Sequence, residues 1–203
     1  MIDVGYSVIA IEREYASGGL EVGTRLAEKL GVPCHSHEIL AKAATELGVT
    51  PEQVAHVEEN ITGSLLYSIA AFANAAAGYG SDSLSLEQKL ALIEEKVIRE
   101  FAASPCVIVG RGACALLKDR ANTLSAFIHA DDKTRTERAV NLYGADPKKV
   151  ESVLRQQDKR RATYFRATTQ MEWKDADIYD LFLNTGRLGV EHTVEILYSV
   201  YKK

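Results

Sequence analysis

The chain has 203 residues, 46% of them hydrophobic and 26% charged, which is the composition of an ordinary globular protein. Its formal net charge of -4 excludes the strongly basic surface that bulk nucleic-acid or anionic-membrane binding requires, so we expect neither as a partner. The three cysteines have no metal-ligand spacing and no apolar run has transmembrane length, so free thiols and a cytoplasmic location are the expectation.

The first predicted element is a buried strand over residues 7–13, because consecutive apolar residues there favour extended structure. A small-residue turn and an amphipathic helix follow at once, and Gly31 is expected to end this helix. Its buried face is predicted to carry Leu20, Gly23, Ala27 and Leu30. Residues 32–35 are predicted to be a brief extended link, and residues 37–47 the next helix.

Capping sequences predict two further helix starts, at residues 50–53 and at residues 85–88. Between them lies a nearly uncharged, alanine-rich stretch at residues 64–77. Its small side chains suggest a homodimer contact, although burial within one monomer explains them equally well. Since residues 32–105 hold several helices and no long strand, we predict a helical insertion over the sheet.

Three more buried strands are predicted at residues 106–109, 124–129 and 180–184. Helices are predicted from about Asp131, over residues 146–170 and over residues 190–201. Because apolar strands alternate with helices, the predicted fold class is α/β, a parallel sheet flanked by helices with right-handed crossovers. The whole chain, residues 1–203, is expected to form a single domain.

The turn after the first strand has the local shape of a phosphate-binding strand–loop–helix unit. A Walker A loop reads G-x-x-x-x-G-K-[ST], and Gly18 takes the place of its second glycine. Gly19 stands where the lysine belongs, and Leu20 stands where the Mg²⁺-binding hydroxyl belongs. If the loop binds phosphate, its positive charge must come from elsewhere; an ordinary tight turn is the alternative.

Arginines elsewhere in the chain are candidates for that charge. Ligands of open parallel sheets bind beyond the carboxyl ends of the strands. Arg111 follows the strand at residues 106–109 between two glycines, and its planar guanidinium group suits phosphate. A surface arginine in a loop is the alternative interpretation.

A basic run lies on the helix predicted over residues 146–170. Spacings of three residues are expected to place three side chains on one face: Arg155, Asp158 and Arg161. Arg160 and Tyr164 are expected to be adjacent at a spacing of four. Such a cluster can clamp phosphates with Asp158 orienting the arginines, but a solvated helix face explains the charges equally well.

Taken together, these segments resemble the cytidylate kinase-like family, a branch of the P-loop nucleoside monophosphate kinases. The matching pieces are IEREYASGG at residues 11–19, LAEKLG at 26–31, VGRGA at 109–113, DKRR at 158–161 with Tyr164, Trp173 and YDLFLNT at 179–185. Their order and spacing over nearly the whole chain carry the resemblance. Ala16 stands where relatives are expected to have glycine, and cytidylate kinases proper keep the loop lysine.

The resemblance implies a P-loop kinase core with a helical acceptor-binding insertion at residues 32–105. It also implies a helical lid at residues 146–175, whose arginines close over the phosphates. ATP with Mg²⁺ is the implied donor, and a nucleoside monophosphate, CMP or dCMP, is the implied acceptor. The alternatives are a nucleotide-binding regulatory protein without catalysis and a kinase of a non-nucleotide metabolite.

The resemblance also implies a donor side of the site. The donor phosphates are expected at Ser17, Gly18 and Gly19. Asn184 and Arg187 are expected to border the donor base. The Mg²⁺ ligand stays open, with Glu14 or a water held by Ser17 as the candidates.

On the acceptor side, Arg111 is expected to hold the acceptor phosphate. Arg155 and Arg161 are expected to stabilise the transferring group, with further acceptor contacts from Asp158 and Tyr164. Arg13 is the candidate for the charge of the missing lysine, and Arg160 is the second choice. The catalytic set is therefore Arg13, Arg111, Arg155 and Arg161.

Overall fold

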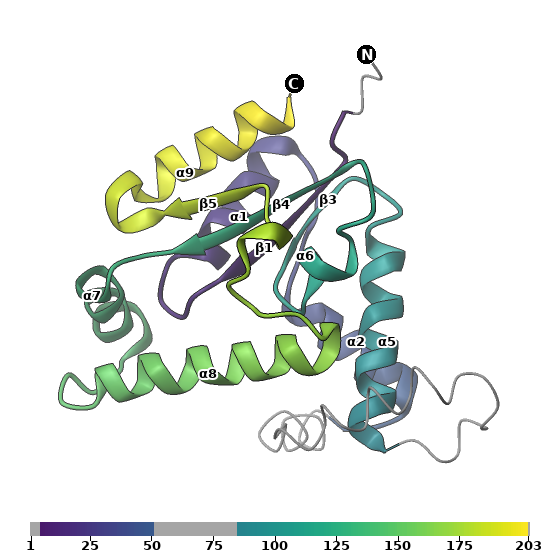
Figure 1. Cartoon of the computed structure of the whole chain (residues 1–203), viewed down its shortest axis with the longest axis horizontal. Helices are drawn as coiled ribbons and strands as arrows, with labels where there is room; N and C mark the ends of the chain where they lie inside the picture. Colours follow the sequence, from purple (N-terminus) through teal and green to yellow (C-terminus); the bar gives the residue numbers. More distant parts are fainter. Residues whose placement is uncertain (1–4, 51–84, 203) are drawn as a thin grey trace.

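The computed structural model describes residues 5–50 and 85–202, and a five-stranded parallel sheet lies at its centre (Figure 1). The strands are β1 (Val8–Arg13), β2 (Cys34–His35), β3 (Cys106–Val109), β4 (Thr123–His129) and β5 (Leu181–Asn184). Their order is β2-β3-β1-β4-β5, and every neighbouring pair is parallel. The predicted α/β class with a parallel sheet is confirmed.

Helices cover both faces of this sheet (Figure 1). They are α1 (Gly19–Leu30), α2 (His37–Leu47), α5 (Leu86–Phe101), α6 (Ala113–Leu116), α7 (Asp132–Tyr143), α8 (Val150–Thr169) and α9 (Thr185–Tyr201), with a 3₁₀ turn at Ala176–Ile178. Alternate residues of β1 point to opposite faces. Ile9 and Ile11 therefore pack with α1 and α9, whereas Val8 and Ala10 pack with α5, α6 and α8.

The described helices begin and end largely where capping residues predict. At the start of α5, Gln88 N donates to Ser85 Oγ at 3.3 Å, and Ser85 N donates to Gln88 Oε1 at 2.8 Å. The Asp131 side chain caps α7 by accepting from Thr134 N at 2.9 Å. Gly31 ends α1 with a φ of +70°, a backbone conformation that glycine adopts without strain.

Three sequence predictions need correction. Residues 32–35 include a true edge strand, because Cys34 and His35 pair with β3. The last helix begins earlier than predicted, at Thr185, and is kinked at Gly189, where φ is +74°. Leu20 is 36% exposed and does not belong to the buried face of α1, whose buried residues are Gly19, Val22, Gly23, Leu26 and Ala27.

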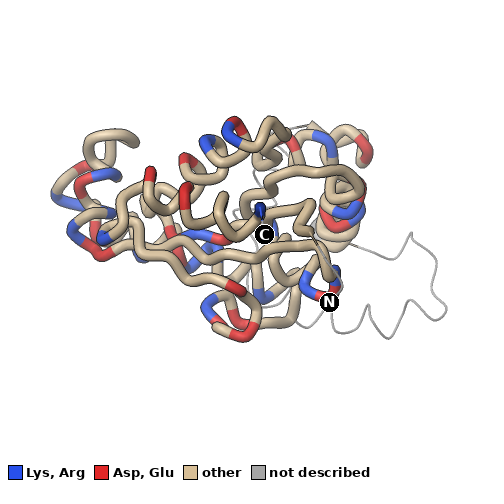
Figure 2. The backbone as a smooth tube through the Cα atoms, turned by 90° about the horizontal axis from the view of Figure 1, so that it is seen from above, with Lys and Arg blue, Asp and Glu red and all other residues tan. Residues whose placement is uncertain are grey.

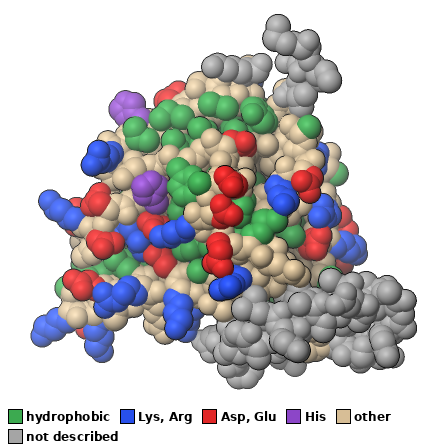
Figure 3. Space-filling model, in the orientation of Figure 1, with side chains coloured by type: hydrophobic (Ala, Val, Ile, Leu, Met, Phe, Trp, Pro, Cys, Tyr) green, Lys and Arg blue, Asp and Glu red, His purple; other side chains and the backbone are tan. Residues whose placement is uncertain are grey.

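The other expectations for the insertion fall outside the described residues. These are the helix start at residues 50–53 and the alanine-rich stretch at 64–77 with its homodimer hypothesis. At residues 5–50 and 85–202, no helix combines the length and the apolar character that a membrane span requires. Along the backbone, basic and acidic positions are interspersed (Figure 2), as they are on the face shown in Figure 3.

Candidate active site

The loop between β1 and α1 is tightly built and partly strained. Ala16 has a φ of +59° and Gly18 a φ of +84°. A left-handed conformation costs an alanine about 1–2 kcal/mol, whereas glycine adopts it freely. Ser17 is fully buried, and its Oγ donates to Glu14 O at 2.9 Å. A Cβ at Gly19 would collide with the Arg13 side chain, so the second glycine is needed for close packing.

This loop presents its backbone at the N-terminus of α1, where the helix dipole favours an anion. Gly18 caps the helix with its backbone, and its carbonyl accepts from Val22 N at 2.9 Å. On the other side, Thr185 Oγ1 fixes the loop by donating to Ser17 O at 2.6 Å. The loop is therefore held in one shape by its neighbours, and the three residues expected at the donor phosphates, Ser17, Gly18 and Gly19, are buried.

A cavity of about 460 Å³ opens beyond the carboxyl ends of β1 and β3. Its lining includes five residues that the sequence analysis singled out: Arg13, Arg111, Arg160, Arg161 and Tyr164. They come from the two strand ends and from one side of α8. The structure thus brings together four of the five arginines that we assigned to phosphates or to the transferring group, without Arg155, and we call this space the arginine pocket.

Arg111 is held in the arginine pocket by a buried carboxylate. Its Nη1 lies 3.4 Å from Glu94 Oε1, and its guanidinium carbon lies 5.3 Å from the centre of the Tyr164 ring. Tyr164 also donates its hydroxyl proton to Glu94, and burial together with this carboxylate raises the pKa of the phenol. Glu94 lies on α5 and is 1% exposed, so this buried carboxylate orients the Arg111 guanidinium group and the Tyr164 hydroxyl group.

Arg13 and Arg161 crowd positive charge into the same space. Arg161 Nη1 donates to Arg13 O at 2.9 Å. Burial lowers the pKa of Arg13, while the neighbouring Glu12 carboxylate raises it and the charge of Arg111 lowers it. Burial and the nearby Arg13 lower the pKa of Arg161 to about 9. A bound anion would relieve both the desolvation and the repulsion, so the pocket favours a negatively charged ligand.

Gly110 is expected to be essential for the position of Arg13. Its φ is +85°, and a Cβ there would collide with the Arg13 guanidinium group. We expect Gly110→Ala to displace Arg13 and to destabilise the fold by about 1–3 kcal/mol, measured by denaturant unfolding. Gly31→Ala is the matched control, because Gly31 has a φ of +70° with open space around it. Equal losses in the two variants would contradict the predicted contact.

The structure places Arg13 differently from our expectation for the missing lysine. The Arg13 stem runs under Gly19, and its guanidinium group lies against Gly110 in the arginine pocket. The cation at the glycine turn itself is Arg138 on α7, which the sequence analysis missed. Its guanidinium carbon lies 3.3 Å from the position that a Cβ on Gly18 would take.

Arg138 is also poised to bind a ligand. Its Nη2 donates to Glu21 Oε2 at 2.6 Å, which fixes it to the first turn of α1. Its Nε is buried and has no hydrogen-bond partner at residues 5–50 or 85–202. Buried polar groups are normally hydrogen-bonded. The signal in the sequence was an arginine pair, Arg135 and Arg138, on the helix that follows the carboxyl end of β4.

Glu14, one of our candidates for a Mg²⁺ ligand, is already engaged. Its Oε2 lies 3.2 Å from Arg135 Nη1, and Lys174 donates to its Oε1. It also accepts from Ala130 N at 3.3 Å. Within the described parts of the chain, no group of three or more His, Cys, Asp or Glu is arranged to hold a metal ion.

The predicted common face of Arg155, Asp158 and Arg161 is wrong. The side chain of Arg155 is 74% exposed and lies 3.7 Å from Glu151, away from the arginine pocket. Six residues of helix rotate by about 600°, so Arg155 and Arg161 differ by about 120° around the axis. Asp158 lies between them, and both of its oxygens contact protein groups.

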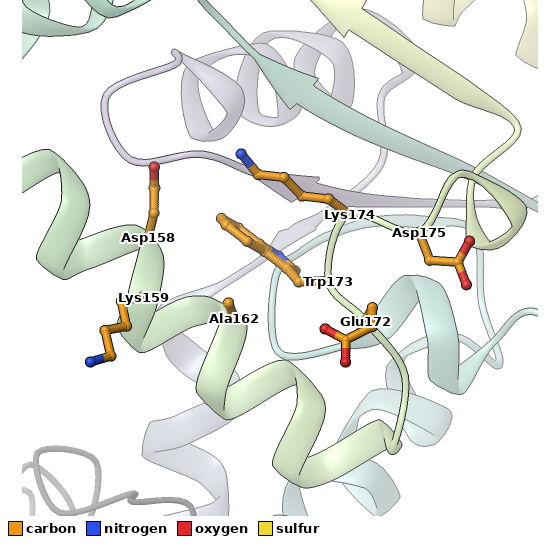
Figure 4. Close-up of a pocket in the computed structure, with 7 residues that line it drawn as sticks. All are labelled: Asp158, Lys159, Ala162, Glu172, Trp173, Lys174 and Asp175. Carbon is orange, nitrogen blue, oxygen red and sulfur yellow. The ribbon is translucent and has the colours of Figure 1, made fainter.

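The residues expected near the donor base have simpler observed positions. Asn184 caps α9, accepting from Gly186 N at 2.9 Å and Arg187 N at 3.3 Å, and Arg187 itself is exposed. Trp173, one of the residues that carry the resemblance, is 3% exposed, and its Nε1 donates to Glu12 Oε2 at 3.2 Å. It lies beside a second cavity, of about 650 Å³, between α8 and residues 172–175 (Figure 4).

The parallel sheet, the glycine turn at the start of α1 and the strand order define a P-loop kinase fold. The family model described as "Cytidylate kinase-like family" matches residues 8–187. The chain therefore belongs to the cytidylate kinase-like family. A search of curated proteins found no significant match.

Solved structures agree with this fold. An uncharacterized protein from Eubacterium ventriosum ATCC 27560 is 26% identical with a TM-score of 0.71, covering 96% of this chain and 97% of that one. Shikimate kinase from Bacteroides thetaiotaomicron is 14% identical with a TM-score of 0.56, covering 97% and 98%. Shikimate kinase from Acinetobacter baumannii, solved with shikimate, is 13% identical with a TM-score of 0.51, covering 96% and 92%.

Proposed function

We propose that this protein transfers a phosphoryl group from ATP to a small anionic acceptor, with CMP or dCMP as the first candidates. The observation that carries this proposal is the arginine pocket, which shares Arg13 with the glycine turn, since the Arg13 stem packs against Gly19. Arg13, Arg111 and Arg161 meet there with Arg160, although the whole chain is acidic. Phosphoryl transfer needs mainly positioning and charge neutralisation, which such a cluster provides.

On the donor side, the backbone of Gly18 and Gly19 and the dipole of α1 would hold the ATP phosphates. Arg138 would supply the cation that the loop lacks, since its guanidinium group lies at Gly18 and its buried Nε has no hydrogen-bond partner within the described residues. Mg²⁺ would neutralise phosphate charge when bound. Proteins commonly hold Mg²⁺ through one or two carboxylates, with substrate phosphates and water as its other ligands.

On the acceptor side, Arg111 would bind the acceptor phosphate, and Glu94 and Tyr164 would keep its guanidinium group directed into the pocket. Arg13 and Arg161 would face the transferring group from the end of β1 and from α8. The hydrogen bonds that arginine donates to phosphate are charge-assisted and often bidentate. The crowding of these cations before a ligand arrives favours binding of a dianionic group over a neutral one.

Two alternative functions differ from this proposal: one has another acceptor, and the other has no acceptor. The structurally similar shikimate kinases make a non-nucleotide metabolite a second candidate class for this fold. The absence of the loop lysine supports a nucleotide-binding protein without catalysis as the third. In that case Arg138 would hold ATP without promoting its transfer.

An acceptor screen with the purified protein separates these functions. ADP formation from ATP and Mg²⁺ would be measured with each nucleoside monophosphate, with shikimate and with other phosphorylated or carboxylated metabolites. We expect CMP or dCMP to raise turnover well above the rate without acceptor. If shikimate is the only acceptor that raises turnover, the result would favour a kinase of a non-nucleotide metabolite. If ATP raises the melting temperature while no acceptor is phosphorylated, the protein binds nucleotide without catalysis.

A further inference from the structure

We propose that Asp158 and Arg135 together form a clamp on Tyr15. Through this clamp, α8 sets the conformation of the loop between β1 and α1, which we call the phosphate loop. Tyr15 N donates to Asp158 Oδ1 at 2.8 Å, and Arg135 Nε donates to Tyr15 O at 2.9 Å. Arg135 Nη2 closes the arrangement by donating to Asp158 Oδ2. Both backbone groups of one loop residue are therefore fixed by one ion pair, whose members come from α7 and α8.

The position of the clamp explains why the loop needs it. The next residue, Ala16, has a φ of +59° and so adopts a backbone conformation that side-chain-bearing residues rarely take. Such a conformation persists only when its surroundings fix it. The clamp acts on the peptide groups on both sides of Tyr15, directly before this strained residue. The clamp can thus hold the loop in a backbone conformation that a glycine at position 16 would adopt without these hydrogen bonds.

The clamp is rigidly anchored on the α7 side. Arg135 is 5% exposed, and its Nη1 lies 3.2 Å from Glu14 Oε2. Glu14 is itself held by Lys174 and by the N–H of Ala130 at 3.3 Å. Figure 4 shows Asp158 and Lys174 extending toward the same side, from α8 and from the segment before β5.

On α8, a second contact lies one turn further along. Arg161 Nη1 donates to Arg13 O at 2.9 Å, three residues after Asp158. The helix thus holds the loop at two nearby backbone groups, the carbonyl of Arg13 and the N–H of Tyr15. Because Arg160 and Tyr164 of the same helix line the arginine pocket, a shift of α8 on acceptor binding would also act on the donor loop.

This inference rests on the proposed function and changes one expectation that we drew from the sequence. Both oxygens of Asp158 contact protein groups, so we assign it a positioning role in place of the expected contact with substrate. Arg135 receives the same kind of role. Neither residue needs to touch ATP for its loss to alter ATP binding.

The test combines Asp158→Ala with Ala16→Gly. We expect Asp158→Ala to weaken ATP binding at least 10-fold by calorimetry and to speed hydrogen exchange at the Tyr15 amide. Adding Ala16→Gly to Asp158→Ala should restore most of the affinity, because glycine needs no clamp to adopt a φ near +59°. Ala16→Gly alone should change ATP affinity less than threefold. A role limited to overall stability would show no such rescue.

Glu151→Gln is the matched control, since Glu151 lies on the same helix, is exposed and pairs with Arg155. Asp158→Asn serves if the alanine variant does not fold, because its amide oxygen can still accept from Tyr15 while the ion pair with Arg135 is lost. Unchanged exchange at Tyr15 in folded Asp158→Ala would overturn the proposal, as would absence of rescue by Ala16→Gly. For Asp158→Asn, which keeps the acceptor for Tyr15 N, unchanged ATP affinity would overturn it. Hydrogen exchange needs no turnover, so the clamp can stand even if no acceptor is phosphorylated.

Discussion

Replacing Arg138 by alanine is expected to lower kcat about 100-fold and to weaken ATP binding, because we propose that its charge replaces that of the absent loop lysine. A preorganised donor aimed at a developing phosphate charge commonly contributes about 3 kcal/mol to transition-state stabilisation. Arg138 lies at the turn proposed to hold the ATP phosphates, since its guanidinium carbon is 3.3 Å from the position that a Cβ on Gly18 would take. ADP formation at saturating acceptor and calorimetry with ATP measure the two effects separately.

Arg99→Ala is the control for this experiment. Arg99 lies on α5, its side chain is 55% exposed, and it pairs with Glu95 at 2.8 Å. Arg138→Lys is expected to recover part of the activity, because a point charge returns without the planar guanidinium group. If Arg138→Ala keeps the wild-type kcat and ATP affinity, the charge at the glycine turn comes from Arg13 or Arg160 instead.

The fold was predictable from the sequence because its signals are local. The apolar run of β1, the capping box at Ser85 and the stop at Gly31 each depend on a few neighbouring residues, and each is found where expected. The edge strand β2 was missed as a strand because two residues carry no periodicity. Its pairing with β3 is a tertiary contact that no local pattern reports.

The site was predictable only in part, because side-chain placement depends on helix phase. The arginine pocket contains Arg111 and Arg161 as expected, but Arg155 lies outside it. A spacing of three looked like one face, yet two such steps leave a rotation of about 120° between the first and the last residue. Arg135 and Arg138 were missed because arginines three apart on a polar helix usually form a solvated face.

Glu94 shows a signal that the sequence did carry. It lies four residues after Leu90 and three before Val97, so it falls on the same buried face of α5. A carboxylate at such a position is rarely buried without a partner. The structure supplies that partner as Arg111, which connects the core of the insertion to the proposed acceptor site.

Replacing Arg111 by alanine is expected to lower kcat/KM for the acceptor by about 10- to 150-fold, the effect of losing a charged hydrogen bond worth about 1.5–3 kcal/mol. ATP affinity should stay unchanged, because Arg111 lies at the end of β3 and Arg138 at the glycine turn. The same change removes a cation from the buried Glu94 and should lower the unfolding free energy by about 3 kcal/mol.

The double variant Glu94→Gln with Arg111→Ala separates these two consequences. Glutamine is neutral, so its amide carries no buried charge, and we expect most of the lost stability to return in denaturant unfolding. The acceptor efficiency should stay low, because a neutral amide on α5 cannot replace a guanidinium group in the pocket. Arg99→Ala again serves as the control for the loss of an arginine. If the double variant regains both stability and acceptor efficiency, Arg111 supports the fold and does not bind the acceptor phosphate.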